Sequence, residues 1–165
     1  RLSRRCCSLE PFRFLRKTIM VTVQIQRLSH GVDLPVPALQ TAGSAGADIA
    51  SADEGTLLPG ERRIFRTGFA VAIPTGFEIQ IRPRSVLALS HGITLPNSPA
   101  TIDADYRGEL RVGLINLGQE PFQVTRGMRI AQLVLGRVEP VQFRLADSLP
   151  ATSRGEGGFG STGLK

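Results

Sequence analysis

The sequence predicts an all-β fold, a barrel or jelly roll with one short helix. Two observations point to it. The 18 glycines and 11 prolines of this 165-residue chain are spread as turn signals rather than gathered in one tract. Between them, apolar residues alternate with polar ones or form short runs, as they do in strands. A membrane-spanning helix needs an apolar run of about 18 residues, and no run in this sequence approaches that length. The length of the chain suits one domain. The composition therefore disfavours a helical bundle, a membrane protein and a disulfide scaffold.

The expected elements begin at Met20. Residues 20–26 alternate apolar and polar side chains, the pattern of a half-buried strand. Further strand-like runs are residues 64–73, 77–82, 109–117, 121–124 and 129–138. The one helix candidate is residues 85–90, with Ser85 as its expected N-cap and His91-Gly92 as its end.

The net charge of +6 is unevenly distributed. Residues 1–19 carry +5 of it, whereas residues 20–165 hold 14 basic and 13 acidic side chains. The high isoelectric point therefore belongs to this basic leader and does not indicate nucleic-acid binding. Both cysteines, Cys6 and Cys7, lie in the leader. We expect no stable nucleic-acid binding, no membrane association and a cytoplasmic location.

Three segments are expected. Residues 1–19 are interpreted as upstream sequence, disordered or not native, before a start at Met20, and an Arg-rich organellar presequence is the alternative. Residues 20–147 are expected to form the jelly-roll domain. Residues 148–165 are rich in glycine and lack periodicity, which predicts a flexible C-terminal arm.

Five short segments carry polar residues that a plain β-sandwich does not need. They are residues 45–50, which include Asp48, residues 82–85, Asn97 with residues 101–109, residues 127–133, and residues 154–163. An arginine and a hydroxyl at a helix start make an anion site. Each segment also has a plainer interpretation: Asp48 as a turn acid, Tyr106 as an edge of the core, and Gln132 as a polar residue beside a strand ladder.

In this order, the five segments resemble the motifs of the trimeric dUTPases, the deoxyuridine triphosphate nucleotidohydrolases. The runs T-I-D-A-D-Y-R-G-E and R-G-E-G-G-F-G-S-T-G carry most of the resemblance. It implies a distorted jelly-roll β-barrel of the β-clip type and a homotrimer whose sites are built from more than one subunit. It also implies magnesium-assisted hydrolysis of dUTP to dUMP and pyrophosphate, which keeps uracil out of DNA and supplies dUMP for thymidylate synthesis.

The resemblance implies roles for individual residues on the phosphate side. Asp103 is similar to the base that activates the water attacking the α-phosphorus. The phosphate contacts would come from Arg84, Ser85, the backbone at Val86, and Gln132. Asp48 resembles the acid that holds a water bound to Mg²⁺, an ion that keeps much of its hydration.

Roles on the nucleoside side follow in the same way. Asn97, with the main chain at Thr101 and Ile102, resembles the uracil reader, and Tyr106 the ring beneath the deoxyribose. Arg111 is a further expected substrate contact. In the arm, Arg154 would bind the γ-phosphate, Phe159 would stack on uracil, and Gly160 and Ser161 would contact the substrate.

Two residues depart from the family pattern, and both replace glycine. Val86 stands where the second motif usually has Gly, and Ala100 stands where Gly usually precedes T-I-D. A β-branched residue at position 86 is costly if the backbone there needs positive φ and tolerated if it is helical.

Two other functions remain open from the sequence. A dCTP deaminase of the same fold would carry a further Arg soon after Arg84-Ser85, where this chain has Leu87-Ala88-Leu89. A non-catalytic nucleotide-binding regulator would be expected to have lost the base, yet Asp103 is present.

Overall fold

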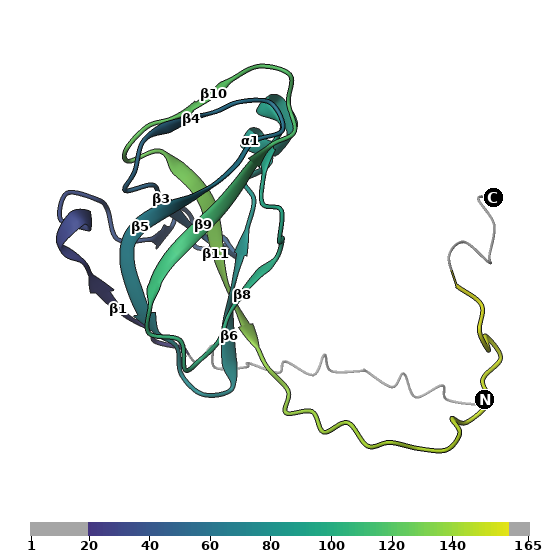
Figure 1. Cartoon of the computed structure of the whole chain (residues 1–165). Helices are drawn as coiled ribbons and strands as arrows, with labels where there is room; N and C mark the ends of the chain where they lie inside the picture. Colours follow the sequence, from purple (N-terminus) through teal and green to yellow (C-terminus); the bar gives the residue numbers. More distant parts are fainter. Residues whose placement is uncertain (1–19, 159–165) are drawn as a thin grey trace, which may run out of the picture.

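The computed structural model describes residues 20–158, which form three antiparallel sheets (Figure 1). One sheet has the order β1-β5-β9-β7 and contains β1 (Gln24–Arg27), β5 (Arg62–Ala72), β9 (Glu109–Asn116) and β7 (Ile93–Thr94). The second has the order β2-β3-β11-β6-β8 and contains β2 (Ala38–Leu39), β3 (Ala47–Ala50), β11 (Arg129–Arg137), β6 (Phe77–Arg82) and β8 (Ala100–Ile102). A two-stranded sheet pairs β10 (Phe122–Val124) with β4 (Gly55–Leu57). Two short helices complete the domain, η1 (Ser29–Gly31) and α1 (Ser85–His91).

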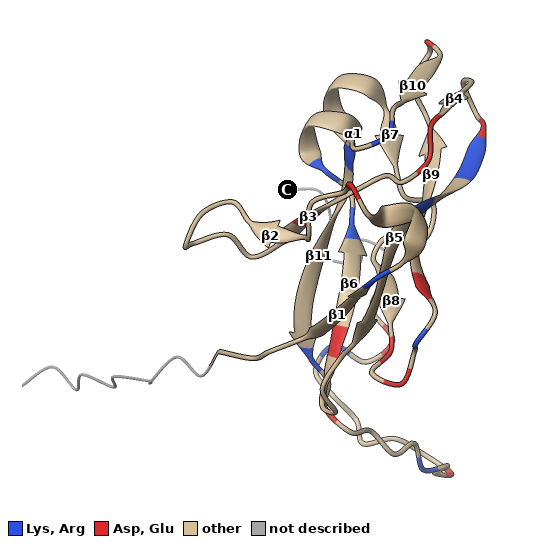
Figure 2. Ribbon diagram, turned by 90° about the vertical axis from the view of Figure 1, so that its left-hand side faces the viewer, with Lys and Arg blue, Asp and Glu red and all other residues tan. Residues whose placement is uncertain are grey.

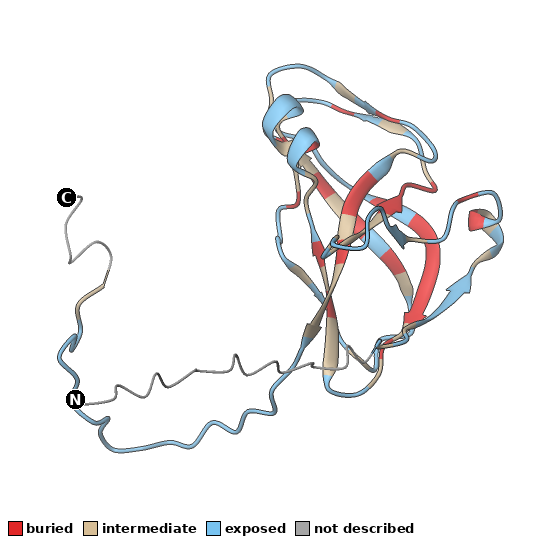
Figure 3. Cartoon of the chain, turned by 180° about the vertical axis from the view of Figure 1, so that it is seen from behind, coloured by how far each residue is buried: buried red, intermediate tan, exposed pale blue. Residues whose placement is uncertain are grey.

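The predicted all-β jelly-roll class is confirmed, with one α-helix among the described residues. The core lies between the two larger sheets, where the inward side chains of successive strands meet. In β9, burial alternates residue by residue, with Leu110, Val112 and Leu114 at most 1% exposed. Figure 3 shows buried stretches along several strands of the domain.

Strand β11 lies at the centre of the five-stranded sheet, and its pairing with β3 and β6 aligns residues of all three strands in one row. Its Gln132 is opposite Asp48 of β3 on one side and Arg82 of β6 on the other. Three segments that are far apart in the sequence therefore meet in one row. The end of β6 leads directly into α1 at this level. Figure 1 shows α1 at one end of the domain, whereas β9 begins at the opposite end.

The longer predicted elements are found within one or two residues of their expected bounds. β5, β6, β9, β10 and β11 match the expected runs, and β6 matches at both ends. The strand expected at residues 20–26 is shorter and shifted, since pairing covers only Gln24–Arg27. All four residues of β1 are exposed because it is an edge strand, although Val21 and Val23 before it are half-buried.

The helix also corrects one expectation. Ser85 is the first residue of α1 and not its N-cap, because Arg84 holds the cap position with an extended backbone, at φ −91° and ψ 132°. No side chain caps this end. The predicted end is confirmed: Gly92 adopts a left-handed φ of 70°, and its amide bonds back to the Ala88 carbonyl.

Beyond β11, residues 138–158 form no strand and lie away from the sheets (Figure 1). Val141, Phe143 and Leu145, which alternate with polar residues, are 72%, 91% and 104% exposed. Basic and acidic residues are interspersed over the domain (Figure 2). None of the helices in the described part is both long and apolar enough to cross a membrane.

Candidate active site

A pocket of about 350 Å³ opens where β3, β6 and β11 meet below the start of α1. We call it the Asp48 pocket. Its lining residues are Gln40, Ser44, Ala45, Gly46, Asp48, Arg82, Arg84, Gln132 and Val134. The structure thus brings together three of the predicted phosphate-side residues, Asp48, Arg84 and Gln132. A side chain on Gly46 would come within 3.1 Å of the Gln132 amide oxygen, so glycine there leaves room for Gln132.

Asp48 is held by two arginines. Its Oδ1 accepts from Arg84 Nε at 3.2 Å, and its Oδ2 accepts from Arg129 Nη1 at 2.9 Å. The Asp48 side chain is only 9% exposed, so these charge-assisted contacts act away from bulk water. With two guanidiniums around one carboxylate, the cluster has an excess of positive charge and suits a polyanionic ligand.

The two glycine replacements fit the backbone as the structure shows it. Val86 lies inside the first turn of α1, a helical position that a β-branched residue can adopt, and it is half-exposed. Ala100 lies in β8, opposite Ile81 of β6. Neither position has a positive φ, because the described residues with positive φ are all glycines. The costly alternative considered for Val86 therefore does not apply.

Asp103 lies elsewhere, on the turn that connects β8 to β9. Its carbonyl accepts from the Tyr106 amide at 3.2 Å, which closes the turn. Arg107 supports the same turn by donating to the carbonyls of Ala104 and Tyr106, at 2.7 and 2.8 Å. The Asp103 side chain is exposed, and no side chain within residues 20–158 hydrogen-bonds to its carboxylate.

The register of β8 on β6 separates Asp103 from the Asp48 pocket. Ile102 pairs with Ile79, so Asp103 lies beyond the level of Ile79, whereas Arg84 follows the far end of β6. At the rise of a strand, the two backbones are roughly 15–20 Å apart. Within one chain, Asp103 therefore cannot act on a group bound at Arg84.

The nucleoside-side residues lie in two places. Asn97 and Arg111 line a second pocket of about 470 Å³, together with Arg62, Arg63 and Pro96. Thr101 and Ile102 lie in β8. Tyr106 is 42% exposed, and its hydroxyl donates to the Glu109 carbonyl at 3.0 Å. Thr101, Ile102 and Tyr106 thus lie along the segment that contains Asp103, whereas Asn97 and Arg111 line the second pocket.

Glu109 anchors this connection to the rest of the domain. Its Oε1 accepts from the Gly68 amide at 2.9 Å and lies 2.7 Å from His30 Nε2. Burial raises the pKa of the Glu109 carboxyl, but the hydrogen bonds from His30 and Gly68 and the charge of Arg111 outweigh it. The pKa of Glu109 is therefore below its ordinary value of 4.5.

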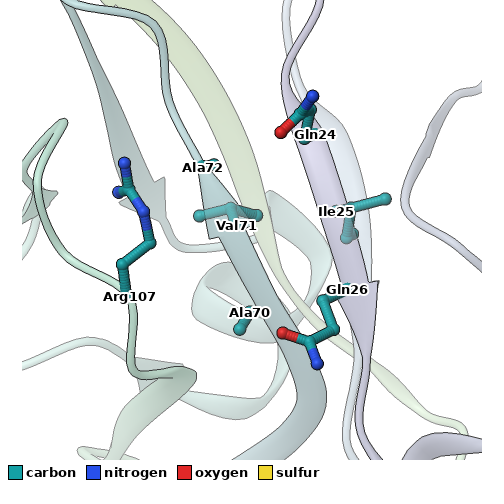
Figure 4. A pocket seen from close by; sticks show the side chains of 7 residues that line it. All are labelled: Gln24, Ile25, Gln26, Ala70, Val71, Ala72 and Arg107. Carbon is teal, nitrogen blue, oxygen red and sulfur yellow. The ribbon is translucent and has the colours of Figure 1, made fainter.

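A third pocket, of about 400 Å³, lies between β1 and β5 (Figure 4). Gln24, Gln26, Ala70 and Arg107 are among its lining residues, and none of the predicted site residues is. Arg107 reaches this pocket from the Asp103 turn. The pocket lies at the edge strand β1 and shares no lining residue with the Asp48 pocket.

The arm is described in part. Arg154 is exposed, and its Nε donates to the Gly157 carbonyl at 2.7 Å, so its contacts are local. Phe159, Gly160 and Ser161 lie outside the described residues, as does the leader at residues 1–19.

Sequence reasoning missed Arg129 as a member of the site. Arg129 was part of a noted segment, but its ion pair with Asp48 joins residues 81 positions apart in the sequence. The available signal was the order R-I-A-Q, which places Arg129 three residues before Gln132.

Comparisons with known proteins agree with one another. A sequence model of the dUTPase family matches residues 33–163. A deoxyuridine 5'-triphosphate nucleotidohydrolase of Zymomonas mobilis is 53% identical over 144 residues, which cover 87% of this chain and 99% of the relative. That of Methylocella silvestris is 54% identical over 147 residues, covering 87% and 92%. Among solved structures, a mutant dUTPase of Staphylococcus bacteriophage 80alpha with dUpNHpp superposes with a TM-score of 0.80 at 25% identity, covering 87% of this chain and 99% of that one.

Proposed function

Because this chain belongs to the dUTPase family, we propose that it hydrolyses dUTP to dUMP and pyrophosphate, at sites that two or more copies of the chain complete together. The observation that carries the proposal is the Asp48 pocket. There, Arg84 at the N-cap of α1 and Gln132 of β11 converge beside a carboxylate that is held in place.

The Asp48 pocket is the phosphate side of the proposed site. A triphosphate brings several negative charges, so the residues that receive it supply cations and polar hydrogen-bond donors. Arg84 supplies a guanidinium only 20% exposed, and Gln132 supplies an amide facing the same space. Ser85 and the amide of Val86, in the first turn of α1, complete the set of proposed contacts.

Magnesium fits this pocket as an ion carried with the substrate. Mg²⁺ keeps several waters and binds through phosphates and one or two carboxylates. Asp48 is the single carboxylate lining the pocket, and no group of three or more acidic, His or Cys side chains in the described part is placed to hold a metal. Both Asp48 oxygens accept from arginines, so we propose that Asp48 holds a water of the ion and not the ion itself. When bound, Mg²⁺ would neutralise phosphate charge.

Asp103 is the proposed base. A carboxylate that orients and deprotonates the attacking water is worth about 10²–10⁴-fold in rate. Because Asp103 lies roughly 15–20 Å from Arg84 in its own chain, we propose that it serves the Asp48 pocket of a second copy. Thr101, Ile102, Asn97, Tyr106 and Arg111 would come with it, so this copy would also hold the nucleoside.

The exposed segment after β11 supports a homotrimer. Val141, Phe143 and Leu145 alternate with polar residues as in a half-buried strand, yet they contact no sheet of their own chain. Contact with another copy would bury them. The same segment would carry the arm, with Arg154 for the γ-phosphate and Phe159 for uracil, to a site on a neighbouring subunit.

The test is a substrate panel. The protein is incubated with Mg²⁺ and dUTP, dCTP or UTP, while pyrophosphate, ammonia and oligomeric state are measured. We expect pyrophosphate from dUTP alone, no ammonia and a trimer. Ammonia from dCTP would indicate a deaminase of the same fold, which the relatives do not favour. Nucleotide binding without turnover would indicate a regulator.

A further inference from the structure

Arg129, the first residue of β11, connects Asp48 and Arg84, two of the three charged residues that line the Asp48 pocket. Its guanidinium donates through Nη1 to Asp48 Oδ2 at 2.9 Å. Its main-chain carbonyl accepts from Arg84 Nη1 at 3.1 Å. Arg84 Nε in turn contacts Asp48 Oδ1 at 3.2 Å. The three residues therefore form a closed ring in which Arg129 contacts both of the others.

A bulge in β11 gives Arg129 this position. Arg129 is opposite Ala50 and Ala131 is opposite Ile49, so one extra residue of β11 lies between two consecutive residues of β3. Ile130 and Ala131 are consequently both buried, at 1% and 0% exposure. The bulge re-aims the side chain before it, and bulges of this kind are common beside functional sites. Without the extra residue, Arg129 would not stand beside Asp48 in this register.

Arg129 limits how Arg84 can bind Asp48. A carboxylate and a guanidinium readily form a bidentate pair, with two parallel N–H···O bonds. Here Arg129 occupies Oδ2, and Arg84 makes only one long contact to Oδ1, while its Nη1 is held by a carbonyl. Within the described residues, Arg84 Nη2 donates no hydrogen bond to protein. Arg84 thus keeps donors for a ligand.

Building on the proposed function, we propose that Arg129 is a positioning residue: by occupying one oxygen of Asp48, it prevents Arg84 from closing a bidentate pair and keeps that guanidinium available to the triphosphate. Arg129 itself is half-exposed at 49%. Without it, Arg84 would turn to Asp48 and would have to break that pair before binding phosphate.

The test compares two ligands in wild type and in Arg129→Gln. Binding of a non-hydrolysable dUTP analogue depends on the phosphate side of the proposed site, whereas binding of dUMP depends mainly on the nucleoside side. We expect Arg129→Gln to weaken the analogue roughly tenfold or more, in line with one charged hydrogen bond, and to change dUMP affinity by less than about threefold. Arg129→Lys, which keeps the positive charge beside Asp48, should recover most of the loss. Arg137→Gln, at the other end of β11, is the matched control and should bind both ligands as wild type does.

The second measurement is a double-mutant cycle with Asp48→Asn. If Arg129 acts through Asp48, the loss in analogue affinity from Arg129→Gln should nearly disappear in the Asp48→Asn background. Equal losses in both backgrounds would overturn the inference, as would equal weakening of analogue and dUMP in Arg129→Gln. If Arg129→Gln does not assemble, Arg129→Ala replaces it in both measurements, and the same outcomes support or overturn the inference. Failure of the proposed function looks different: the wild type itself would not hydrolyse dUTP.

Discussion

The two ends of this domain organise charge in different ways. At the Asp48 pocket, charged groups from β3, β11 and the start of α1 contact one another directly, and the carboxylate is nearly buried. At the opposite end, Asp103 lies exposed on a turn held by backbone hydrogen bonds and by Arg107. The Asp48 pocket, which is the proposed phosphate side, is therefore preorganised within one chain, whereas the carboxylate proposed as the base is available at the surface, where another copy can meet it.

This difference explains why one chain is not a complete catalyst in the proposed mechanism. The register of β11 on β3 places Gln132 beside Asp48, whereas the register of β8 on β6 carries the end of β8, and Asp103 after it, away from α1. Strand pairing holds that separation, so no side-chain rotation within one chain can close it. Variants that disrupt one end of the domain, and mixtures of such variants, test whether the two ends of one chain work together.

The largest effect is expected at the exposed end. Asp103→Asn should lower turnover by about 10²–10⁴-fold, because the amide keeps the shape but cannot accept a proton. Affinity for a non-hydrolysable dUTP analogue should stay within a few fold. Asp105→Asn, two residues further along the same turn, is the control and should keep near wild-type turnover. Steady-state kinetics of the two variants test the role of Asp103: wild-type turnover in Asp103→Asn would remove Asp103 from the mechanism.

A second large effect is expected from the arm. Deleting residues 152–165 should lower turnover by about a hundredfold or more, because the proposed contacts of Arg154 and Phe159 with the substrate would be lost. The melting temperature should hardly change, since Arg154 and Thr152 contact only their own segment. Calorimetry and kinetics on the same preparation separate the two effects. Full activity after the deletion would exclude the arm from the reaction.

Mixing two inactive variants tests directly whether the two ends of an active site come from different copies of the chain. Arg84→Gln breaks the phosphate end and Asp103→Asn breaks the other end, and each variant alone should be nearly inactive. If a site takes its ends from different copies, co-refolded chains should regain roughly a quarter of wild-type activity, from sites in which both contributing ends are intact. Mixing without refolding is the control. If the mixture shows no more activity than a single variant, both ends must come from one chain.

How far the sequence predicted this arrangement depends on the length of each element. β5, β6, β9 and β11 are long enough for alternation to be visible, and they were predicted nearly to the residue. β7 and β8 have two and three residues, too few for any period, and β3 lies in a run of small residues in which Ile49 is the one large apolar side chain. The family motifs predicted Asp48, Arg84, Gln132 and Asp103 as site residues, but not their distribution between the two ends. That distribution follows from the register of β8 on β6, and the contact of Arg129 with Asp48 follows from a bulge, neither of which is visible in the sequence.

The smallest effect is expected where the exposed end is anchored. The pKa of Glu109 is below its ordinary value of 4.5, because hydrogen bonds from His30 and the Gly68 amide outweigh the cost of burial. A carboxyl whose pKa is lowered on folding stabilises the protein above its unfolded pKa, and that contribution is lost as the pH falls through the folded pKa. Glu109→Gln should therefore destabilise the domain at pH 7 by on the order of 1 kcal/mol, the scale of a hydrogen bond to a charged group. The difference in melting temperature from wild type should shrink as the pH falls below 4.5. Glu120→Gln, at an exposed position, is the control and should show little difference at any pH. A Glu109→Gln protein as stable as wild type at pH 7 would show that backbone contacts alone hold the Asp103 turn.

The effect of Glu109→Gln on turnover at pH 7 should be modest. The Tyr106 hydroxyl bonds to the main-chain carbonyl of residue 109, which the substitution leaves in place.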